Sequence, residues 1–266
     1  MSAPFRTSSD GIFLYHQRLS PYKWLRHGFS LRKDQNGVEL SYGLNEYQAA
    51  ETVLKNRQRL VRSVSGRELP LATLRQMHSD CVFRASPALL NDPPQGDGWV
   101  SVEPHLLVAV QTADCLPVLL VDPPKRVVAA VHAGWRGALM RIVRKAVHQM
   151  QTDFGSEPVD CLAVVGPAIG RCCYEVGDEL VDAFSREFQS ADAFLFKALG
   201  SKATRSHSRC IDLAEVCRAQ LLEAGLTPEN ILTGGPCTAC DRDRFFSHRA
   251  GAGEAGRMMA VIGIVD

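Results

Sequence analysis

The sequence predicts a mixed α/β fold, a layered domain in which helices cover a mixed β-sheet. Short, valine-rich apolar segments alternate with longer segments whose apolar residues recur at spacings of three and four. The short segments are apolar at consecutive positions, which is typical of strands that are covered on both faces. Strands and helices follow one another irregularly, so a regular βαβ winding is not expected.

Four helices are predicted from apolar spacing and from terminal signals. The first three span residues 46–64, 138–152 and 177–188, each with apolar residues on one face. The fourth is the best delimited, because Asp212 can cap its first amides and Gly225 offers a left-handed stop. All four are therefore expected to pack one face against the sheet.

The predicted strands fall into a stronger and a weaker group. The stronger group contains Leu106–Val110, Val127–Val131, Leu162–Val165 and Met259–Val265. The weaker group contains Cys81–Ala85, Val118–Val121 and Phe245–His248. The stronger strands are expected at the centre of the sheet because apolar residues occupy both of their faces.

Composition and charge exclude several classes of protein. The chain has 266 residues, is 45% hydrophobic and 22% charged, and carries a formal net charge of +1. These values exclude disordered, collagen-like and coiled-coil chains, and the absence of a basic excess argues against a nucleic-acid partner. The start of the sequence holds no apolar run of signal-peptide length, and no later run reaches the length of a membrane span, so we expect a cytoplasmic protein with no membrane partner. The proline-rich breaks at 92–94 and 122–124 are short enough to be turns, so the chain is not divided there.

Nine cysteines are present, an odd number that favours thiols, metal ligands or nucleophiles over disulfides. Cys172 and Cys173 are adjacent and cannot readily hold one zinc ion together, so we interpret them as structural. Cys237 and Cys240 match the PCxxC half of the zinc-deaminase signature, but its His-x-Glu half is missing. No second CxxC motif completes a structural zinc site, so this pair is predicted to be a turn with two thiols.

Polar residues that follow predicted strands carry the clearest chemical signal. Cys115 and His132 stand 17 residues apart, which fits a strand, a turn and a second strand that bring them together. Such a pair suits either a thiolate nucleophile held by an imidazole or a zinc site. His78, among polar residues before an apolar run, is the best candidate for a third ligand. A buried thiol at Cys115 and a capping role for His132 remain the simpler alternatives.

Six motifs occur in order along the chain. They are Gln76–Ser79, Gly96–Gly98, Ala113–Val118, His132–Gly137, Gly166–Gly170 with Cys172–Gly177, and Phe245–Arg249. Together they resemble the laccase-domain family, also called the multicopper polyphenol oxidase family, over about residues 24–265. The resemblance implies a single mixed α/β catalytic domain over residues 1–266, with 1–23 as a lead-in.

The resemblance also implies an activity and a metal site. Bacterial members of the family are described as purine nucleoside phosphorylases that also deaminate adenosine. The implied partners are purine nucleosides, namely adenosine, inosine or methylthioadenosine, together with phosphate. The family's metal ligands fall here on His78, Cys115 and His132. This donor set suits zinc, and it can also bind copper.

Further site residues are candidates for proton transfer and for substrate binding. Asp114 and Glu175 are the candidates for moving the proton in deamination, although a helix cap or a salt bridge would explain either carboxylate. Arg32, Arg136 and Arg249 could clamp phosphate with their guanidinium groups, and Arg32 and Asn45 match the family's amino-terminal motifs. For Arg136, a structural salt bridge is the commoner explanation.

Three other functions remain open. A copper-dependent polyphenol oxidase is disfavoured, because trinuclear copper clusters usually take His-x-His pairs and no two histidines here stand two positions apart. A Cys-His hydrolase would use Cys115 as its nucleophile without any metal. A non-catalytic metal-binding protein would bind zinc without turning over a nucleoside.

Overall fold

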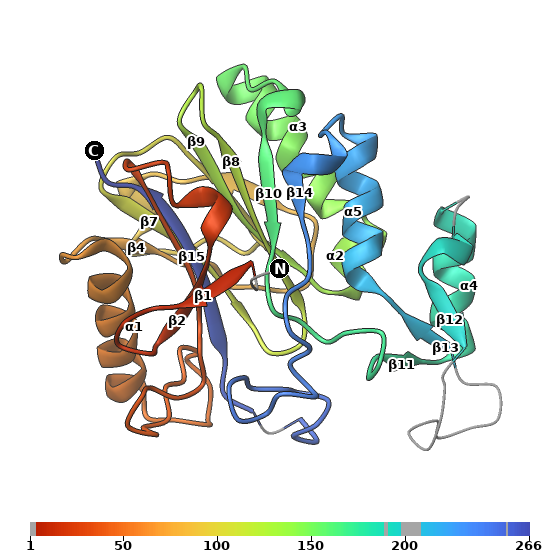
Figure 1. Cartoon of the computed structure of the whole chain (residues 1–266), viewed down its shortest axis with the longest axis horizontal. Helices are drawn as coiled ribbons and strands as arrows, with labels where there is room; N and C mark the ends of the chain where they lie inside the picture. The colour runs from red at the N-terminus through yellow and green to blue at the C-terminus, as the bar shows by residue number, and fades with distance from the viewer. Residues whose placement is uncertain (1–3, 189–190, 198–208, 254) are drawn as a thin grey trace.

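The computed structural model describes residues 4–188, 191–197, 209–253 and 255–266, and two six-stranded sheets form its centre (Figure 1). The first sheet has the order β1 (Phe5–Thr7), β2 (Phe13–His16), β3 (Leu25–Ser30), β15 (Met258–Ile264), β7 (Leu106–Thr112) and β4 (Leu71–Ala72). Its strands pair antiparallel except for β4 and β7. The predicted lead-in thus contributes β1 and β2 to this sheet.

The second sheet carries the hairpin that matters for the site. Its order is β14 (Ile231–Leu232), β10 (Leu162–Val165), β8 (Leu116–Asp122), β9 (Val127–Ala133), β6 (Gly98–Ser101) and β5 (Val82–Arg84). The outermost pair at each edge is parallel and the inner pairs are antiparallel. A small antiparallel sheet has the order β11 (Glu175–Val176), β13 (Arg209–Ile211) and β12 (Leu195–Lys197).

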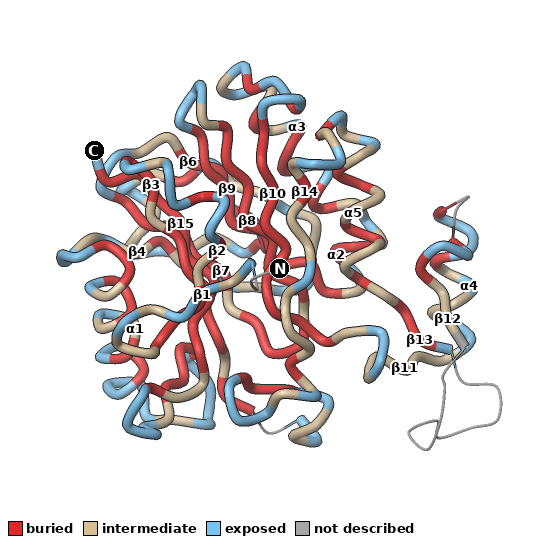
Figure 2. Tube along the Cα trace, in the orientation of Figure 1, coloured by how far each residue is buried: buried red, intermediate tan, exposed pale blue. Residues whose placement is uncertain are grey.

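The main core lies between the two large sheets. It contains Val108, Val110, Ala260 and Ile262 from the first sheet and Leu119, Val121, Val128 and Ala130 from the second. Figure 2 shows the central strands buried along most of their length. Each of these strands faces the other sheet on one side and a helix on the other, which explains why their sequences are apolar at consecutive positions.

Helices cover the outer faces of the two sheets (Figure 1). Helix α1 (Ala50–Ser65) packs on the first sheet, where Leu60 and Val64 join a cluster with Ala109 and Val261. On the second sheet lie α3 (Ile142–Phe154) and α5 (Leu213–Glu223). Helices α2 (Trp135–Leu139) and α4 (Asp178–Glu187) share a further cluster with α5 and the small sheet. Short 3-10 helices span Gln17–Leu19, Pro87–Leu89, Pro158–Asp160, Ala191–Ala193 and Pro228–Asn230.

The predicted fold class is confirmed, and the strands are divided between two sheets. The four stronger strands and two of the weaker ones appear within a few residues of their predicted bounds. The predicted strand Phe245–His248 is wrong, because this segment is a turn that buries Phe245 and Phe246 in the core between the sheets. The predicted helix 138–152 is interrupted at Arg141, whose φ of 62° separates α2 from α3.

The other predicted helices match closely. Helix α1 begins four residues after the predicted start at 46 and ends at Ser65, and α4 lies one residue inside the predicted 177–188 at each end. In α5, the Asp212 carboxylate accepts the Ala214 and Glu215 amides, and Gly225 has a φ of 98°. Among the described helices, none is both long and apolar enough to cross a membrane.

Candidate metal centre

The β8–β9 hairpin brings Cys115 and His132 together, as the spacing predicts. Pro117 pairs with His132 and Leu116 pairs with Ala133, so Cys115, just before β8, lies beside the end of β9. His78 reaches the same place from the loop between β4 and β5. The hairpin and the distant loop that carries His78 therefore meet at one end of the inner strands β8 and β9.

The three side chains form a compact donor set. The ligand atoms all lie within 4.8 Å of one another, and His78 Nε2 is 3.9 Å from Cys115 Sγ. Tetrahedral zinc with nitrogen and sulfur ligands would separate such atoms by about 3.5 Å, close to this arrangement. Gly134 makes the approach possible, because a Cβ there would lie 2.9 Å from His78 Cδ2 and 3.1 Å from Cys115 Sγ. Two imidazoles and one thiolate fit a metal with an open position.

Asp97 contacts one candidate ligand, His132, and the loop that carries another, His78. Its carboxylate is fully buried and accepts the backbone amides of Met77, His78 and Ser79, at 3.3, 3.1 and 2.6 Å. The same carboxylate lies 2.7 Å from His132 Nδ1. Asp97 thus orients His132 with its Nε2 toward the other ligands and fixes the loop on which His78 stands at a φ of 61°.

The three groups shift one another's pKa. Burial raises the pKa of the Cys115 thiol, but the charge of His132 and hydrogen bonds from both histidines bring it to about 6. Burial lowers the pKa of His132, whereas the Cys115 thiolate and Asp97 raise it to about 9. Burial raises the pKa of Asp97, but His132 and Ser79 lower it to about 2. Cys115 and His132 therefore form a thiolate–imidazolium pair near neutral pH.

A cavity of about 580 Å³ opens beside the donor set. Its volume lies in the range of small-molecule sites. The lining residues are Gly43, Leu44, Asn45, Arg57, Thr73, Leu74, Arg75, Gln76, His78, Pro93, Gln111, Thr112, Ala113, Cys115, His132, His248 and Arg257. The donor set and a mixed polar and apolar cavity thus form one candidate site.

Three arginines line this cavity. Arg57 donates to the Tyr42 carbonyl, and Arg257 donates to the Ala255 and Gly256 carbonyls, at 2.8, 2.7 and 3.2 Å. Arg75 forms an exposed ion pair with Asp92. The ion pairs found among the described residues include neither Arg57 nor Arg257, so their charge is available to an anion.

The predicted substrate-binding residues are placed differently from one another. Asn45 lines the cavity. Arg32 pairs with Glu39 at 2.7 Å, Arg136 lies over the Trp135 ring, and Arg249 lies over another ring and donates to the Glu175 carbonyl. None of these three arginines belongs to the cavity lining.

The two predicted proton-transfer residues also lie outside the cavity lining. Asp114, at a φ of 86°, accepts Thr238 Oγ1 at 2.6 Å and the Arg249 amide at 2.7 Å. It therefore ties the turn before Cys115 to the carboxyl-terminal loop. Glu175 lies in β11, in the small sheet.

Sequence reasoning assigned no role to several residues of the site. Asp97 stands between two glycines, in one of the six motifs that carry the family resemblance. That position could have indicated a carboxylate with a role in the site. Arg57 lies on the polar side of a predicted helix, and Arg257 lies just before a predicted strand. Their position on one cavity depends on long-range pairing, which local spacing does not show.

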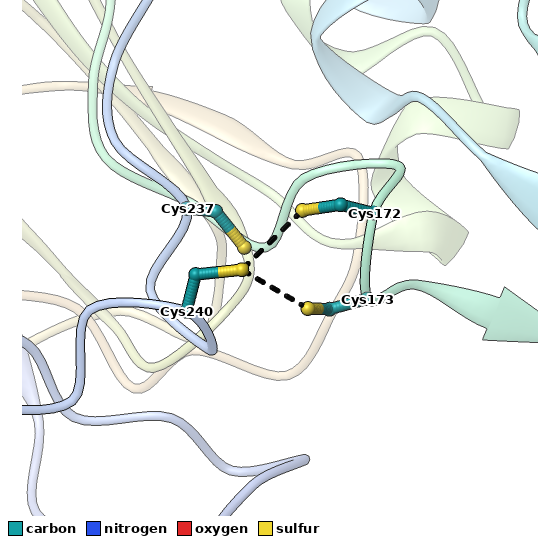
Figure 3. A group of neighbouring side chains, drawn as sticks. All are labelled: Cys172, Cys173, Cys237 and Cys240. Carbon is teal, nitrogen blue, oxygen red and sulfur yellow. Dashed lines mark hydrogen bonds between the residues drawn. The ribbon is translucent and has the colours of Figure 1, made fainter. Parts of the chain in front are cut away.

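The second group of cysteines is also brought together. Cys172, Cys173, Cys237 and Cys240 point toward one another from two separate turns (Figure 3). Their sulfur atoms all lie within 4.8 Å of one another. The interpretation of two unrelated structural pairs therefore missed a single four-cysteine cluster, because the fold, not local spacing, supplies the second pair.

The fold and the site define a layered α/β protein with a two-histidine, one-cysteine donor set beside a small-molecule cavity. The family model described as multi-copper polyphenol oxidoreductase laccase matches residues 26–265. The chain belongs to this family.

Relatives with curated names include purine nucleoside phosphorylases and an adenosine deaminase. The chain is 38% identical over 170 residues to purine nucleoside phosphorylase YlmD of Bacillus subtilis. This alignment covers 64% of the chain and 59% of that protein. It is 29% identical over 267 residues to a purine nucleoside phosphorylase of Bacteroides thetaiotaomicron, covering 96% and 97%. It is 37% identical over 162 residues to adenosine deaminase RL5 of an unknown prokaryotic organism, covering 60% and 59%.

Solved structures share the whole fold. The crystal structure of the Bacillus licheniformis hypothetical protein YfiH superposes with a TM-score of 0.87 and 28% identity, covering 99% of this chain and all of that one. YlmD from Geobacillus stearothermophilus gives a TM-score of 0.85 and 28% identity, with full coverage of both chains.

Proposed function

We propose that the chain is a zinc-dependent enzyme that cleaves purine nucleosides with phosphate and also deaminates adenosine. The observation that carries this proposal is the set of His78, Cys115 and His132 beside a cavity that arginines line. The names of the relatives support the substrate class. The full chain of residues 1–266 would act as one catalytic domain, to which the lead-in adds β1 and β2.

His78, Cys115 and His132 would hold the zinc ion. When bound by three protein ligands, zinc supplies Lewis acidity and activates water. Asp97 fixes the orientation of His132 through the 2.7 Å contact with Nδ1, and it orders the backbone around His78. The ligand forms are the Cys115 thiolate and neutral imidazoles, so His132, whose pKa the Cys115 thiolate and Asp97 raise to about 9, would release its proton as zinc binds.

Phosphorolysis transfers the ribose from a purine nitrogen to a phosphate oxygen, giving free base and ribose 1-phosphate. Arg57 and Arg257 would bind the phosphate, because both line the cavity without a carboxylate partner among the described ion pairs. Gly43 packs against the Arg257 side chain, where a Cβ would lie 2.5 Å from Cγ, and so limits its movement. Two guanidinium groups can hold a phosphate through charge-assisted hydrogen bonds.

The remaining lining residues would bind base and ribose. Asn45 donates to the Ala255 carbonyl at 3.3 Å, and Gln76 and Gln111 are joined by two hydrogen bonds of 2.8 and 2.6 Å. Leu44 and Leu74 supply apolar surface that a purine ring can contact. These contacts make the cavity wall a rigid mixture of amides and apolar groups.

Asp114 and Glu175 are the candidates for proton transfer that the sequence offers. Both Asp114 oxygens accept hydrogen bonds from the protein, so we propose that Asp114 positions Cys115 and does not carry the proton. Glu175 lies outside the cavity lining, and its backbone carbonyl accepts the Arg249 side chain at 2.8 Å, so we propose that it does not carry the proton either. His248 lines the cavity and is the further side chain there that can exchange a proton.

The test is metal content and product analysis on protein purified without added metal. Adenosine is supplied with and without phosphate to the wild type, to Cys115→Ala and to Cys81→Ser, whose exposed thiol lies outside both cysteine-containing clusters. We expect adenine only with phosphate, inosine in both buffers, and loss of both products in Cys115→Ala but not in Cys81→Ser. Full turnover by the wild type after complete removal of zinc would contradict the proposal.

A Cys-His hydrolase is the second candidate, favoured by the thiolate–imidazolium pair and by Asp97 behind His132. Alkylation and chelation separate the two candidates. A hydrolase would retain its activity in chelator and lose it to an alkylating agent in metal-free buffer. A zinc enzyme would lose its activity in chelator and recover it when zinc is returned.

A copper-dependent oxidase has less support from the structure. In the part of the chain that is described, possible ligands gather at only two places, the mixed set and the four cysteines. Neither is a multi-histidine copper cluster. Copper bound at the mixed site remains a candidate metal, because copper(II) generally binds such donors more tightly than zinc does.

A further inference from the structure

Four cysteines converge away from the nucleoside cavity. Cys172 and Cys173 stand on the turn between β10 and β11, and Cys237 and Cys240 stand on the loop between β14 and β15. Cys240 Sγ lies 3.6 Å from Cys172 Sγ and 3.4 Å from Cys173 Sγ. None of the four lines the cavity.

We propose that this four-cysteine cluster is a second metal site, which binds one structural Zn²⁺ through four thiolates. Structural zinc sites have four protein ligands in a tetrahedron and no open position. The proposal is independent of the nucleoside activity, because it concerns a different set of ligands in a different part of the molecule.

The sulfur positions fit one ion better than disulfides. Zinc–sulfur bonds of about 2.3 Å place the four sulfurs of a tetrahedron about 3.8 Å apart. The two measured contacts are near that value, and all six separations stay within 4.8 Å. A disulfide would instead select one pair at about 2.05 Å. Cys240 is near Cys172 and Cys173 at once, so the turn brings both adjacent thiols to a common centre, contrary to the expectation from their adjacency in sequence.

The local backbone supports a thiolate at Cys237 and fixes both turns. The Gly170 amide donates to Cys237 Sγ at 3.2 Å, so a ligand of one turn receives a hydrogen bond from the other. Such amide contacts orient a metal thiolate and offset part of its charge. The Tyr174 amide donates to the Gly170 carbonyl at 3.0 Å, and the Asp241 amide donates to the Cys237 carbonyl at 3.1 Å. Both cysteine pairs therefore stand on closed turns.

Charge and access are also suitable. Binding Zn²⁺ releases four thiol protons and leaves the site with a net charge of about −2. Arg171 directly precedes Cys172, whereas Asp241 and Arg242 follow Cys240 and offset each other, so the nearby charge in sequence is one cation beside the first turn. Cys172 and Cys240 are exposed, which gives the ion a path of entry from solvent.

The ion would join two segments that hold the first site in place. Outside the cysteines these segments meet through Ala168, whose amide donates to the Pro236 carbonyl and whose carbonyl accepts the Thr238 amide. Each segment also binds Asp114, because the Ile169 amide donates to its carbonyl and Thr238 Oγ1 donates to its carboxylate. The four-cysteine cluster therefore supports the residue that precedes Cys115.

The first experiment counts zinc per chain after purification under reducing conditions without added metal. We expect two zinc ions in the wild type and in Cys81→Ser, one in Cys240→Ser and one in Cys115→Ala. If the wild type and Cys240→Ser hold the same amount of zinc, the proposal is wrong. A disulfide between two of the four cysteines in the freshly reduced protein, detected by mass spectrometry, would also overturn it.

A second experiment leaves the cluster intact and so does not depend on the folding of Cys240→Ser. X-ray absorption of zinc in Cys115→Ala should show four sulfur neighbours and no nitrogen neighbour. A mixed nitrogen and sulfur shell there would contradict the proposal. If the wild type holds two zinc ions but does not turn over any nucleoside, the proposed function is wrong while the second metal site stands. The failure of one proposal can therefore be distinguished from the failure of the other.

Discussion

The mixed donor set and the four-cysteine cluster differ in nearly every property that separates catalytic from structural metal sites. The mixed set has three donors, a buried carboxylate behind His132 and a cavity of about 580 Å³ in front. The four-cysteine cluster has four like donors on two exposed turns and no place in the cavity lining. A metal with an open coordination position beside a cavity can bind a substrate or water, whereas a metal with four protein ligands stabilises the fold.

The two regions are nevertheless connected through Asp114. This residue directly precedes Cys115, and its oxygens accept hydrogen bonds from the loop that carries Cys237 and Cys240. The four-cysteine cluster therefore supports the mixed set through backbone position alone. Substitutions in the mixed set should lower turnover, whereas substitutions in the four-cysteine cluster should lower the free energy of unfolding.

The largest expected effect comes from exchanging one cysteine in each region. Cys115→Ser should lower nucleoside turnover by more than about 100-fold, because loss of a ligand exceeds the 10–100-fold cost of losing a residue behind it. Cys240→Ser should leave turnover within about fivefold and lower the free energy of unfolding by about 3 kcal/mol or more when zinc is in excess. Steady-state kinetics and denaturant unfolding measure both. If Cys115→Ser and Cys240→Ser lose turnover equally, the assignment of one region to catalysis and the other to stability is wrong.

Asp97→Asn tests the support behind the mixed set. The substitution removes the charge that orients His132 and disturbs a carboxylate that also accepts three backbone amides. We expect zinc affinity at this site to fall by about 10–100-fold, as is typical for a carboxylate behind a histidine ligand. Competition with a coloured chelator measures it. Asp92→Asn, which removes an exposed partner of Arg75, should leave the affinity unchanged.

Acid stability can be separated from metal binding at His27. Burial, followed by the charge of His16, lowers the pKa of His27 to about 4, and its Nε2 accepts the His16 amide at 3.0 Å. The neutral form is favoured by folding, so stability is complete above about pH 6.5 and falls as the pH drops toward 4. At pH 5 the loss should be about 2 kcal/mol.

His27→Gln keeps an acceptor for the His16 amide and cannot take up this proton. Its free energy of unfolding should therefore fall less between pH 7 and pH 5 than that of the wild type, by about 2 kcal/mol. Denaturant titrations at the two pH values measure the difference. If both proteins lose the same stability, His27 is not the group responsible. Because His27→Gln no longer loses stability through this proton, any zinc that it releases in acid can be assigned to protonation of the mixed set or of the four-cysteine cluster.

The sequence predicted the mixed set but not the four-cysteine cluster, and the reason is physical. Cys115 and His132 are joined by a hairpin, whose pairing follows from a short spacing between apolar strands. The two cysteine pairs meet only because β14 lies beside β10 in the second sheet, an arrangement that local periodicity does not determine. For the same reason strand and helix segments could be predicted, whereas their division between two sheets could not. The false strand at Phe245–His248 arose because buried aromatic residues in a turn have the same apolar pattern as a short strand.

The smallest expected effect distinguishes the arginines of the two regions. Arg257 lines the cavity, whereas Arg249 lies over Tyr174 beside the cysteine-bearing turn. Loss of a hydrogen bond to a charged group costs about 1.5–3 kcal/mol, so Arg257→Ala should raise the KM for phosphate by about 10-fold or more. Deamination, which uses no phosphate, should change less. Arg136→Ala, on an exposed side chain of α2, should leave both reactions unchanged. A phosphate KM that rises in Arg249→Ala and not in Arg257→Ala would move the phosphate toward the four-cysteine cluster and reverse the roles assigned to the two regions.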